Sequence, residues 1–132
     1  MLPARGSRQA SGGRAVQVTL IKPTLGRTER GDRFIDDARM EPLPLGVLAG
    51  LTPSGVDLRL FDDRIDTIDY DEPTDLVAIT VETFTARRAY EIAAEYRARG
   101  VPVVMGGMHA TLLPDEVAGH ADAIVTGDAE PV

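Results

Sequence analysis

Short apolar runs rich in β-branched residues alternate along this chain with stretches of helical periodicity. The runs with the length and composition of strands are Ala15–Ile21, Val56–Phe61, Asp75–Val81, Val101–Met105 and Ala123–Thr126. Asp75–Val81 is apolar at nearly every position, which is typical of a central strand buried on both faces of a parallel sheet. Val56–Phe61 alternates between apolar and polar residues and therefore predicts an edge strand.

Helix signals separate these runs, in the segments Pro42–Leu51, Thr85–Arg99 and Pro114–Gly119. Gly100 follows the second segment, at the position where a helix commonly ends in a left-handed residue. Asp62–Thr74 is acidic and lacks helical spacing, so it predicts a turn or a one-turn helix at a solvated edge. The alternation predicts an α/β fold with a Rossmann-like (flavodoxin-like) doubly wound parallel sheet of five strands in the order 2-1-3-4-5.

Two segments lack periodicity. Residues 1–14 are rich in Gly, Ser and Arg and predict a disordered tail ahead of one domain over residues 15–132. Lys22–Glu41 predicts a long loop of the kind that is usually functional or disordered. After the last strand, Gly127–Val132 contains no covering helix. We therefore expect a C-terminally truncated domain whose flank is covered by another domain or chain, or else a short natural reading frame with that flank exposed.

Composition argues against several classes of protein. The 132 residues suffice for one domain, and their net charge of -7 argues against a nucleic-acid surface. No apolar run approaches the roughly 20 residues that span a bilayer, and residues 1–14 lack the apolar core of a secretory signal. With no cysteine, this chain can form neither disulfides nor iron–sulfur clusters. We expect a cytoplasmic protein with neither nucleic-acid nor membrane partners.

The carboxyl ends of the strands are the expected ligand site, because open parallel sheets bind ligands there. Small, hydroxyl or glycine residues follow most of the predicted strands, and the pair Gly106-Gly107 would let a bulky ligand approach the backbone. A tight turn would also explain two glycines. Thr83 can alternatively be the N-cap of the next helix. A structural, hydrogen-bonded role is the commoner use of a lone histidine such as His109, and we favour it for His120.

No catalytic constellation is evident. The chain has no Ser/His/Asp arrangement, no HExxH, no GxxxxGK[ST] and no GxGxxG after the first strand. Asp62-Asp63 resembles the acidic pair of a receiver domain, but that pair would follow the first strand, where this chain has Lys22-Pro23. Thr80-Val81 stands where a receiver has its phosphorylated aspartate. We therefore predict no catalytic residue.

A set of motifs together carries a family resemblance: Met40–Ala49 (MEPLPLGVLA), Asp75–Thr83 (DLVAITVET), Val104–Thr111 (VMGGMHAT) with Leu113–Glu116 (LPDE), and Gly127–Glu130 (GDAE). From roughly residue 15 onward, the chain resembles the N-terminal cobalamin-binding domain of cobalamin-dependent radical S-adenosylmethionine enzymes. The combination of GGxHAT, PDE and GDAE is its most specific part.

The resemblance implies a corrinoid at the carboxyl edge, with its nucleotide tail threading between the sheet and the loops after the first, third and fourth strands. The cofactor-binding residues that it implies are Lys22, Pro23, Thr24, Thr80, Val81, Glu82, Thr83, Gly106, Gly107, His109 and Gly127. Other cobalamin domains carry a cobalt-ligating histidine in a DxHxxG loop after the first strand. Lys22–Arg27 contains no histidine, so we predict base-off cobalamin without a protein ligand to cobalt.

The resemblance also implies a partner. In that family an iron–sulfur cluster and S-adenosylmethionine are bound by a radical barrel, which we expect in cis or in trans and outside these 132 residues. We therefore predict a cobalamin-binding module, and not an enzyme by itself. Two alternatives stay open: a flavodoxin-like interaction or regulatory domain without a cofactor, and a nucleotide- or flavin-binding protein, for which Lys22–Gly26 is a poor phosphate-binding loop.

Overall fold

The computed structural model describes residues 13–26 and 41–130. Its elements are β1 (Val16–Lys22), α1 (Leu43–Leu51), β2 (Val56–Asp62), β3 (Leu76–Thr80), the 3₁₀ turn η1 (Thr83–Thr85), α2 (Ala86–Ala98), β4 (Val103–Gly106), α3 (Met108–Leu112), α4 (Pro114–Ala118) and β5 (Ala123–Ile124). Nearly all of the predicted N-terminal tail, and residues 27–40 of the predicted long loop, lie outside the described residues.

The strands form one sheet in the order β2-β1-β3-β4-β5, and every neighbouring pair is parallel. The predicted fold class and strand order are therefore confirmed, with β2 at an edge and β3 in the centre. The register pairs Leu20 with Ala78, Ala78 with Val104, and Val104 with Ala123. Since side chains alternate along a strand, these residues share one face of the sheet.

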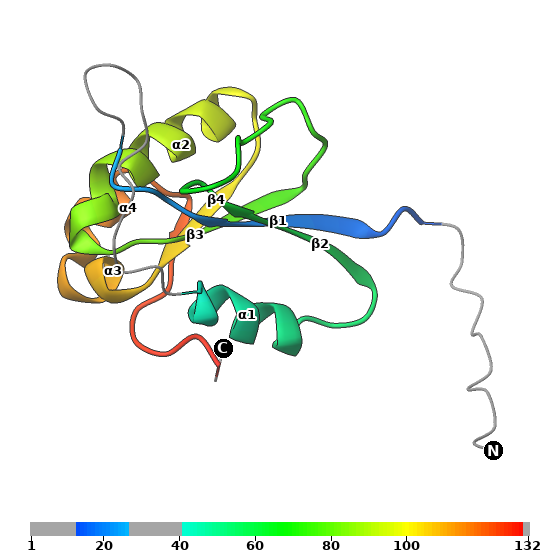
Figure 1. The fold of residues 1–132 in the computed structure, drawn as a ribbon, viewed down its shortest axis with the longest axis horizontal. Helices are drawn as coiled ribbons and strands as arrows, with labels where there is room; N and C mark the ends of the chain where they lie inside the picture. Colours follow the sequence, from blue (N-terminus) through cyan, green and yellow to red (C-terminus); the bar gives the residue numbers. More distant parts are fainter. Residues whose placement is uncertain (1–12, 27–40, 131–132) are drawn as a thin grey trace.

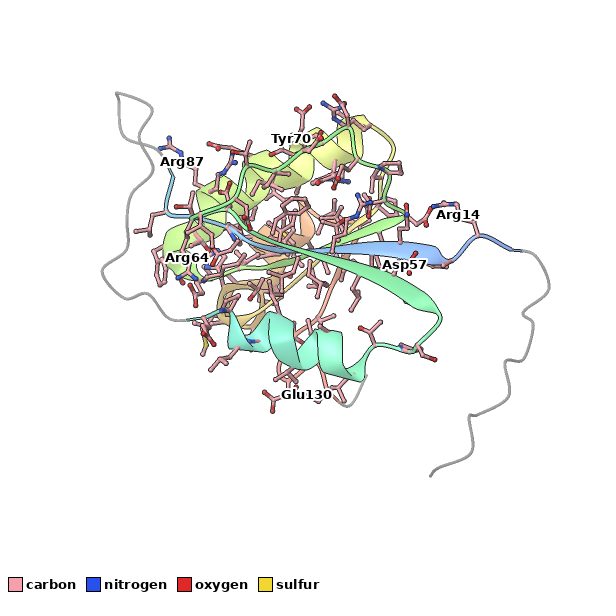
Figure 2. The ribbon with its side chains drawn as sticks, turned by 45° about the vertical axis from the view of Figure 1, so that its right-hand side comes forward. Arg14, Asp57, Arg64, Tyr70, Arg87 and Glu130 are labelled. Atoms are coloured by element: carbon pink, nitrogen blue, oxygen red, sulfur yellow. The ribbon has the colours of Figure 1, made fainter. Side chains whose placement is uncertain are left out.

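The opposite face carries the hydrophobic core. Figure 1 shows α2 and α4 on this side of the sheet and α1 on the other. Alternate strand residues such as Ile21, Val77 and Met105 are fully buried against α2. Tyr70 lies beside α2 (Figure 2), and its ring centroid is 5.0 Å from that of Tyr96. The predicted turn over residues 62–74 is confirmed, because the structure has no helix there.

Two local differences from the predicted elements have clear causes. Val101 and Pro102 precede β4 because the Val101 N–H donates to the Tyr96 carbonyl at 3.0 Å and so belongs to the end of α2. At that helix end Gly100 has φ +77°, as predicted. The sequence did not predict α3, because its N-cap is Gly107 and no side chain caps it. None of the helices in the described ranges has the length and apolar character needed to cross a bilayer.

Candidate ligand-binding cavity

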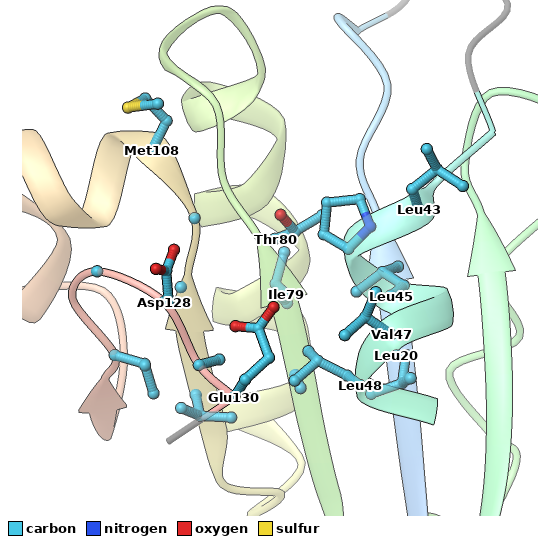
Figure 3. Close-up of a pocket in the computed structure, with 18 of the residues that line it drawn as sticks. Leu20, Leu43, Leu45, Val47, Leu48, Ile79, Thr80, Met108, Asp128 and Glu130 are labelled. Atoms are coloured by element: carbon cyan, nitrogen blue, oxygen red, sulfur yellow. The ribbon is translucent and has the colours of Figure 1, made fainter. Parts of the chain in front are cut away.

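A cavity of about 760 Å³ opens on the α1 side of the sheet, near the carboxyl ends of the central strands. Helix α1 forms one wall, and residues 127–130 after β5 form the other. Figure 3 shows Leu45, Val47 and Leu48 on the helix side, with Asp128 and Glu130 across from them. The floor is the face of β3 and β4 between these two walls.

The cavity exists because the floor is built from small residues. Ala78 and Thr80 of β3, and Val104 and Gly106 of β4, share this face in the register. All four are only partly buried, whereas their neighbours Val77 and Met105 on the α2 face have no exposed surface. Parallel sheets are normally covered on both faces, so an open, small-residue face over central strands marks a place where a ligand can lie.

Helix α1 supplies an apolar wall. Its sequence LPLGVLAGL contains no charged residue, and Leu45 packs against the sheet with 1% exposure. Leu43 and Val47 also line the cavity but are 62% and 44% exposed. A helix that is apolar on all sides is normally buried. The exposed apolar rim is therefore suited to contact with an apolar ligand or a protein surface.

Hydroxyls and carboxylates are the polar side chains of the lining: Thr52, Thr80, Thr111, Asp128 and Glu130. Among the described lining residues there is no lysine, arginine or histidine. Such a cavity favours a largely apolar ligand with hydrogen-bond donors, because carboxylates accept hydrogen bonds and repel anions. It does not have the chemistry of a buried phosphate site.

The two glycines that end β4 have different surroundings. Gly107 has φ +100°, and a Cβ there would lie 2.9 Å from the Val81 carbonyl oxygen and 3.0 Å from the Val81 nitrogen. This glycine is required by the fold itself, as the turn interpretation of the pair proposed. A Cβ on Gly106 would meet only Val125, at 3.5 Å or more. The missing side chain of Gly106 therefore leaves space at the cavity.

The structure brings four of the predicted binding residues together in the cavity lining: Thr80, Gly106, Gly107 and Gly127. The other seven lie outside this lining. Lys22 and Glu82 form an ion pair of 2.6 Å that joins the ends of β1 and β3. Pro23, Thr24 and Val81 are buried. The Thr24 backbone N–H donates to Asp63 at 3.2 Å, while the buried Thr24 hydroxyl has no hydrogen-bond partner among the described residues.

His109 belongs to a hydrogen-bonded cluster behind the cavity. It is 3% exposed, with Nδ1 3.1 Å from the Thr83 hydroxyl and Nε2 3.1 Å from a Glu116 carboxylate oxygen. The Tyr90 hydroxyl donates to the same oxygen at 2.8 Å. The Tyr90 and His109 hydrogen bonds hold the pKa of Glu116 below its usual range. His120 stacks on the Tyr90 ring with centroids 3.8 Å apart. Both histidines thus have hydrogen-bonding or stacking partners within the fold, as a structural use requires.

Thr83 is not a helix N-cap, which corrects one of its two interpretations. Glu82 is the N-cap of η1, and Thr85 precedes α2. The Thr85 hydroxyl accepts the Glu82 N–H at 3.1 Å, so the capping contact comes two residues later than expected. The Thr83 hydroxyl is instead paired with His109.

The prediction that residues 62–74 form a solvated edge is wrong at Asp62 and Asp63, because both side chains are buried. Asp63 is 1% exposed and pairs with Arg88 through two hydrogen bonds of 2.8 and 3.0 Å. Arg64 donates to Asp62 and lowers the pKa of that carboxyl. Arg88 lies 25 residues from Asp63 in the sequence, and Arg64 lies 2 residues from Asp62. The acidic composition of the segment alone could not indicate these pairs. Within the described ranges, acidic and histidine side chains nowhere gather into a group of three that could hold a metal ion.

Sequence reasoning missed most of the cavity wall. The missed lining includes Leu20, Leu43, Leu45, Val47, Leu48, Ala78, Val104, Met108, Thr111, Asp128 and Glu130. One signal was present: α1 has no charged residue, which is unusual for a helix of a protein with 27% charged residues. The alternation of small residues on β3 and β4 was not informative until the register was known.

Comparison with known proteins identifies two related methyltransferases of Chlorobaculum tepidum. The chain is 48% identical over 99 residues to bacteriochlorophyllide d C-8(2)-methyltransferase, a match that covers 72% of the chain and 22% of that protein. It is 39% identical over 93 residues to bacteriochlorophyllide d C-12(1)-methyltransferase, covering 69% of the chain and 20% of the relative. The chain thus spans about a fifth of the length of these relatives. No family model and no solved structure matches it.

Proposed function

We propose that this chain is the cobalamin-binding module of a radical S-adenosylmethionine-type methyltransferase. The observation that carries the proposal is the open, small-residue face of a flavodoxin-like sheet beneath its carboxyl edge, walled by the apolar helix α1. Sequence identity of 48% over 99 residues to one methyltransferase, and of 39% over 93 residues to another, supports the catalytic context. The family motifs identified in the sequence support the cofactor.

The apolar part of the cavity fits the aromatic base of a corrinoid's nucleotide tail, whereas the phosphodiester of that tail would have to lie away from the carboxylates of the wall. The aromatic base of the nucleotide tail would lie between α1 and the floor formed by Ala78 and Val104, where apolar area is available. The acetamide and propionamide groups of the corrin offer hydrogen-bond donors, and Thr80, Asp128 and Glu130 are the lining residues that could accept them. Once bound, the corrinoid supplies the alkyl-transfer chemistry of its cobalt centre, while the protein binds and orients it.

The surroundings of His109 support the prediction of base-off cobalamin without a protein ligand. Both ring nitrogens are already within hydrogen-bond distance of Thr83 and Glu116, and the ring is almost fully buried. Ligation of cobalt would require the ring to leave both partners. We accordingly expect His109→Ala to leave the visible spectrum of bound cobalamin unchanged. A spectral shift that reports lost nitrogen ligation would contradict this part of the proposal.

The remaining chemistry belongs to a partner. We propose that a radical domain, in the same chain or another, holds the iron–sulfur cluster and S-adenosylmethionine and faces the carboxyl edge. The relatives support this because about four-fifths of each lies outside the matched region. The exposed apolar residues Phe84 and Met108, at 59% and 64%, lie after β3 and β4 at that edge and suit a covered surface.

The direct test is a titration of the full chain with hydroxocobalamin, followed by the visible spectrum and by equilibrium dialysis. We expect saturable binding of one corrinoid per chain, tight enough to detect at tens of micromolar. Riboflavin phosphate and ATP serve as controls, and the cavity without basic residues predicts that neither binds. Absence of corrinoid binding would favour the cofactor-free interaction domain, and retention of flavin or nucleotide would favour the remaining alternative.

A further inference from the structure

The outer wall of the cavity is held by few contacts. Strand β5 contains only Ala123 and Ile124, and its register with β4 comprises two residue pairs. Residues 127–130 follow this short strand, and Asp128, Ala129 and Glu130 line the cavity. Such a segment needs an additional contact to keep a fixed position, because a short strand at a sheet edge contributes few hydrogen bonds.

Thr111 of α3 provides that contact. Its hydroxyl donates to the Gly107 carbonyl at 3.0 Å and accepts the Gly127 N–H at 2.9 Å. The Gly107 carbonyl also accepts the Thr111 N–H at 3.1 Å. The hydroxyl proton is therefore directed to Gly107, which leaves a lone pair for Gly127. One side chain thus links the end of β4 to the segment after β5.

The conformation of Gly127 agrees with this link. Gly127 has φ +74°, a left-handed conformation in which the chain turns from β5 toward the cavity. Apart from the neighbours of Gly127 in the chain, none of the described residues has an atom within 4 Å of the position that a Cβ on Gly127 would take. The hydrogen bond to the Thr111 hydroxyl is the contact that anchors its amide.

We propose that Thr111 is a positioning residue that anchors residues 127–130 as the outer wall of the cavity. The wall carries Asp128 and Glu130, so its position decides where the cavity offers carboxylate acceptors. The consequence for ligand retention rests on the proposed corrinoid function, whereas the anchoring itself does not. Release of the wall would widen the mouth and speed the departure of a bound ligand.

The anchor can be tested in the ligand-free chain with two variants. Thr111→Val keeps the shape of the side chain but cannot accept a hydrogen bond, and Thr111→Ser keeps the hydroxyl. By ¹⁵N NMR, we expect the Gly127 amide to exchange with solvent about fivefold faster in the valine variant and at the parental rate in the serine variant. Equal Gly127 exchange in all three proteins would overturn the proposal. Thermal unfolding of each variant shows whether Thr111→Val acts locally or on the whole fold.

The consequence for binding is tested with hydroxocobalamin. We expect the valine variant to release it about fivefold faster than the parent, with rescue by serine. Unchanged release from a valine variant whose Gly127 amide has lost protection would refute the link between wall and ligand. If the parent chain binds no corrinoid, the proposed function fails while the NMR comparison still decides the anchor, so the two failures are distinguishable.

Discussion

At the scale of single residues, the two adjacent glycines at the end of β4 have different structural roles. Gly107 avoids a clash with the backbone of Val81, while Gly106 leaves room at the cavity floor. The sequence indicated that the pair was special, but it could not divide the two roles. That division depends on where Val81 and Val125 lie, and both belong to neighbouring strand ends.

Alanine substitutions of the two glycines should therefore differ in kind. Gly107→Ala forces a side chain into positive φ and into contact with Val81, so we expect a loss of about 2–3 kcal/mol in the free energy of unfolding. Gly106→Ala is the matched control, because its methyl meets Val125 at ordinary distances and should leave stability within about 1 kcal/mol of the parent. Urea unfolding measures both. Equal stability of the two variants would show that the turn at Gly107 is not strained by a side chain.

At the scale of secondary-structure elements, buried ion pairs fix the loops that surround the sheet. Asp63 follows β2 and pairs with Arg88 of α2, while it also accepts the backbone N–H of Thr24 after β1. One carboxylate thus joins three elements. The sequence predicted each of these elements closely, since their boundaries follow from apolar periodicity and glycine positions. It could not predict the pairing, because that depends on tertiary geometry.

Removal of the Asp63 charge should be costly. In Asp63→Asn, the partly buried guanidinium of Arg88 loses its buried partner charge and keeps only a 3.6 Å contact with the exposed Glu91, so we expect a loss of about 2–3 kcal/mol in the free energy of unfolding. Asp71→Asn is the control, because Asp71 pairs with Arg99 but its side chain is 86% exposed, so a change within about 0.5 kcal/mol is expected. Chemical denaturation of both variants measures the contrast. A mild effect at Asp63 equal to that at Asp71 would contradict a structural role for the pair.

Two tyrosines of α2 should make the stability of the folded protein depend on pH in the alkaline range. Burial raises the pKa of Tyr96 to about 12, and burial together with the Glu116 hydrogen bond raises that of Tyr90 to about 12. A folded-state pKa above the unfolded value of about 10 stabilises the folded protein below pH 10, and this stability is lost as the pH rises toward 12. We expect absorbance at 295 nm to show these two phenols ionising near pH 12. A midpoint near 10 for both in the folded protein would be inconsistent with the burial of Tyr96 and with the hydrogen bond of Tyr90 to Glu116.

At the scale of the whole molecule, the two faces of the sheet serve different purposes. The α2 face is a closed core, and the α1 face is a half-open layer of small residues over β3 and β4. The sequence was sufficient for the strand order, because alternating strands and helices allow few parallel topologies. It was not sufficient for the cavity, since Ala78, Val104 and Gly106 are unremarkable until the register places them side by side.

The cavity is the structural basis of the proposed corrinoid site. A side chain that fills it should weaken binding of the nucleotide tail without affecting contacts to the rest of the corrinoid. Ala78→Phe places a ring on the cavity floor, while Ala94→Phe makes the same change on an exposed position of α2. Cobinamide, which lacks the nucleotide tail, is the matched ligand for comparison with cobalamin. Thermal unfolding establishes that both variants are folded before binding is compared.

The decisive measurement is the dissociation constant of hydroxocobalamin for these variants by equilibrium dialysis. We expect Ala78→Phe to weaken cobalamin at least about tenfold, to leave cobinamide unchanged, and Ala94→Phe to match the parent. Cobalamin bound equally tightly by a folded Ala78→Phe protein would contradict a nucleotide tail between α1 and the sheet.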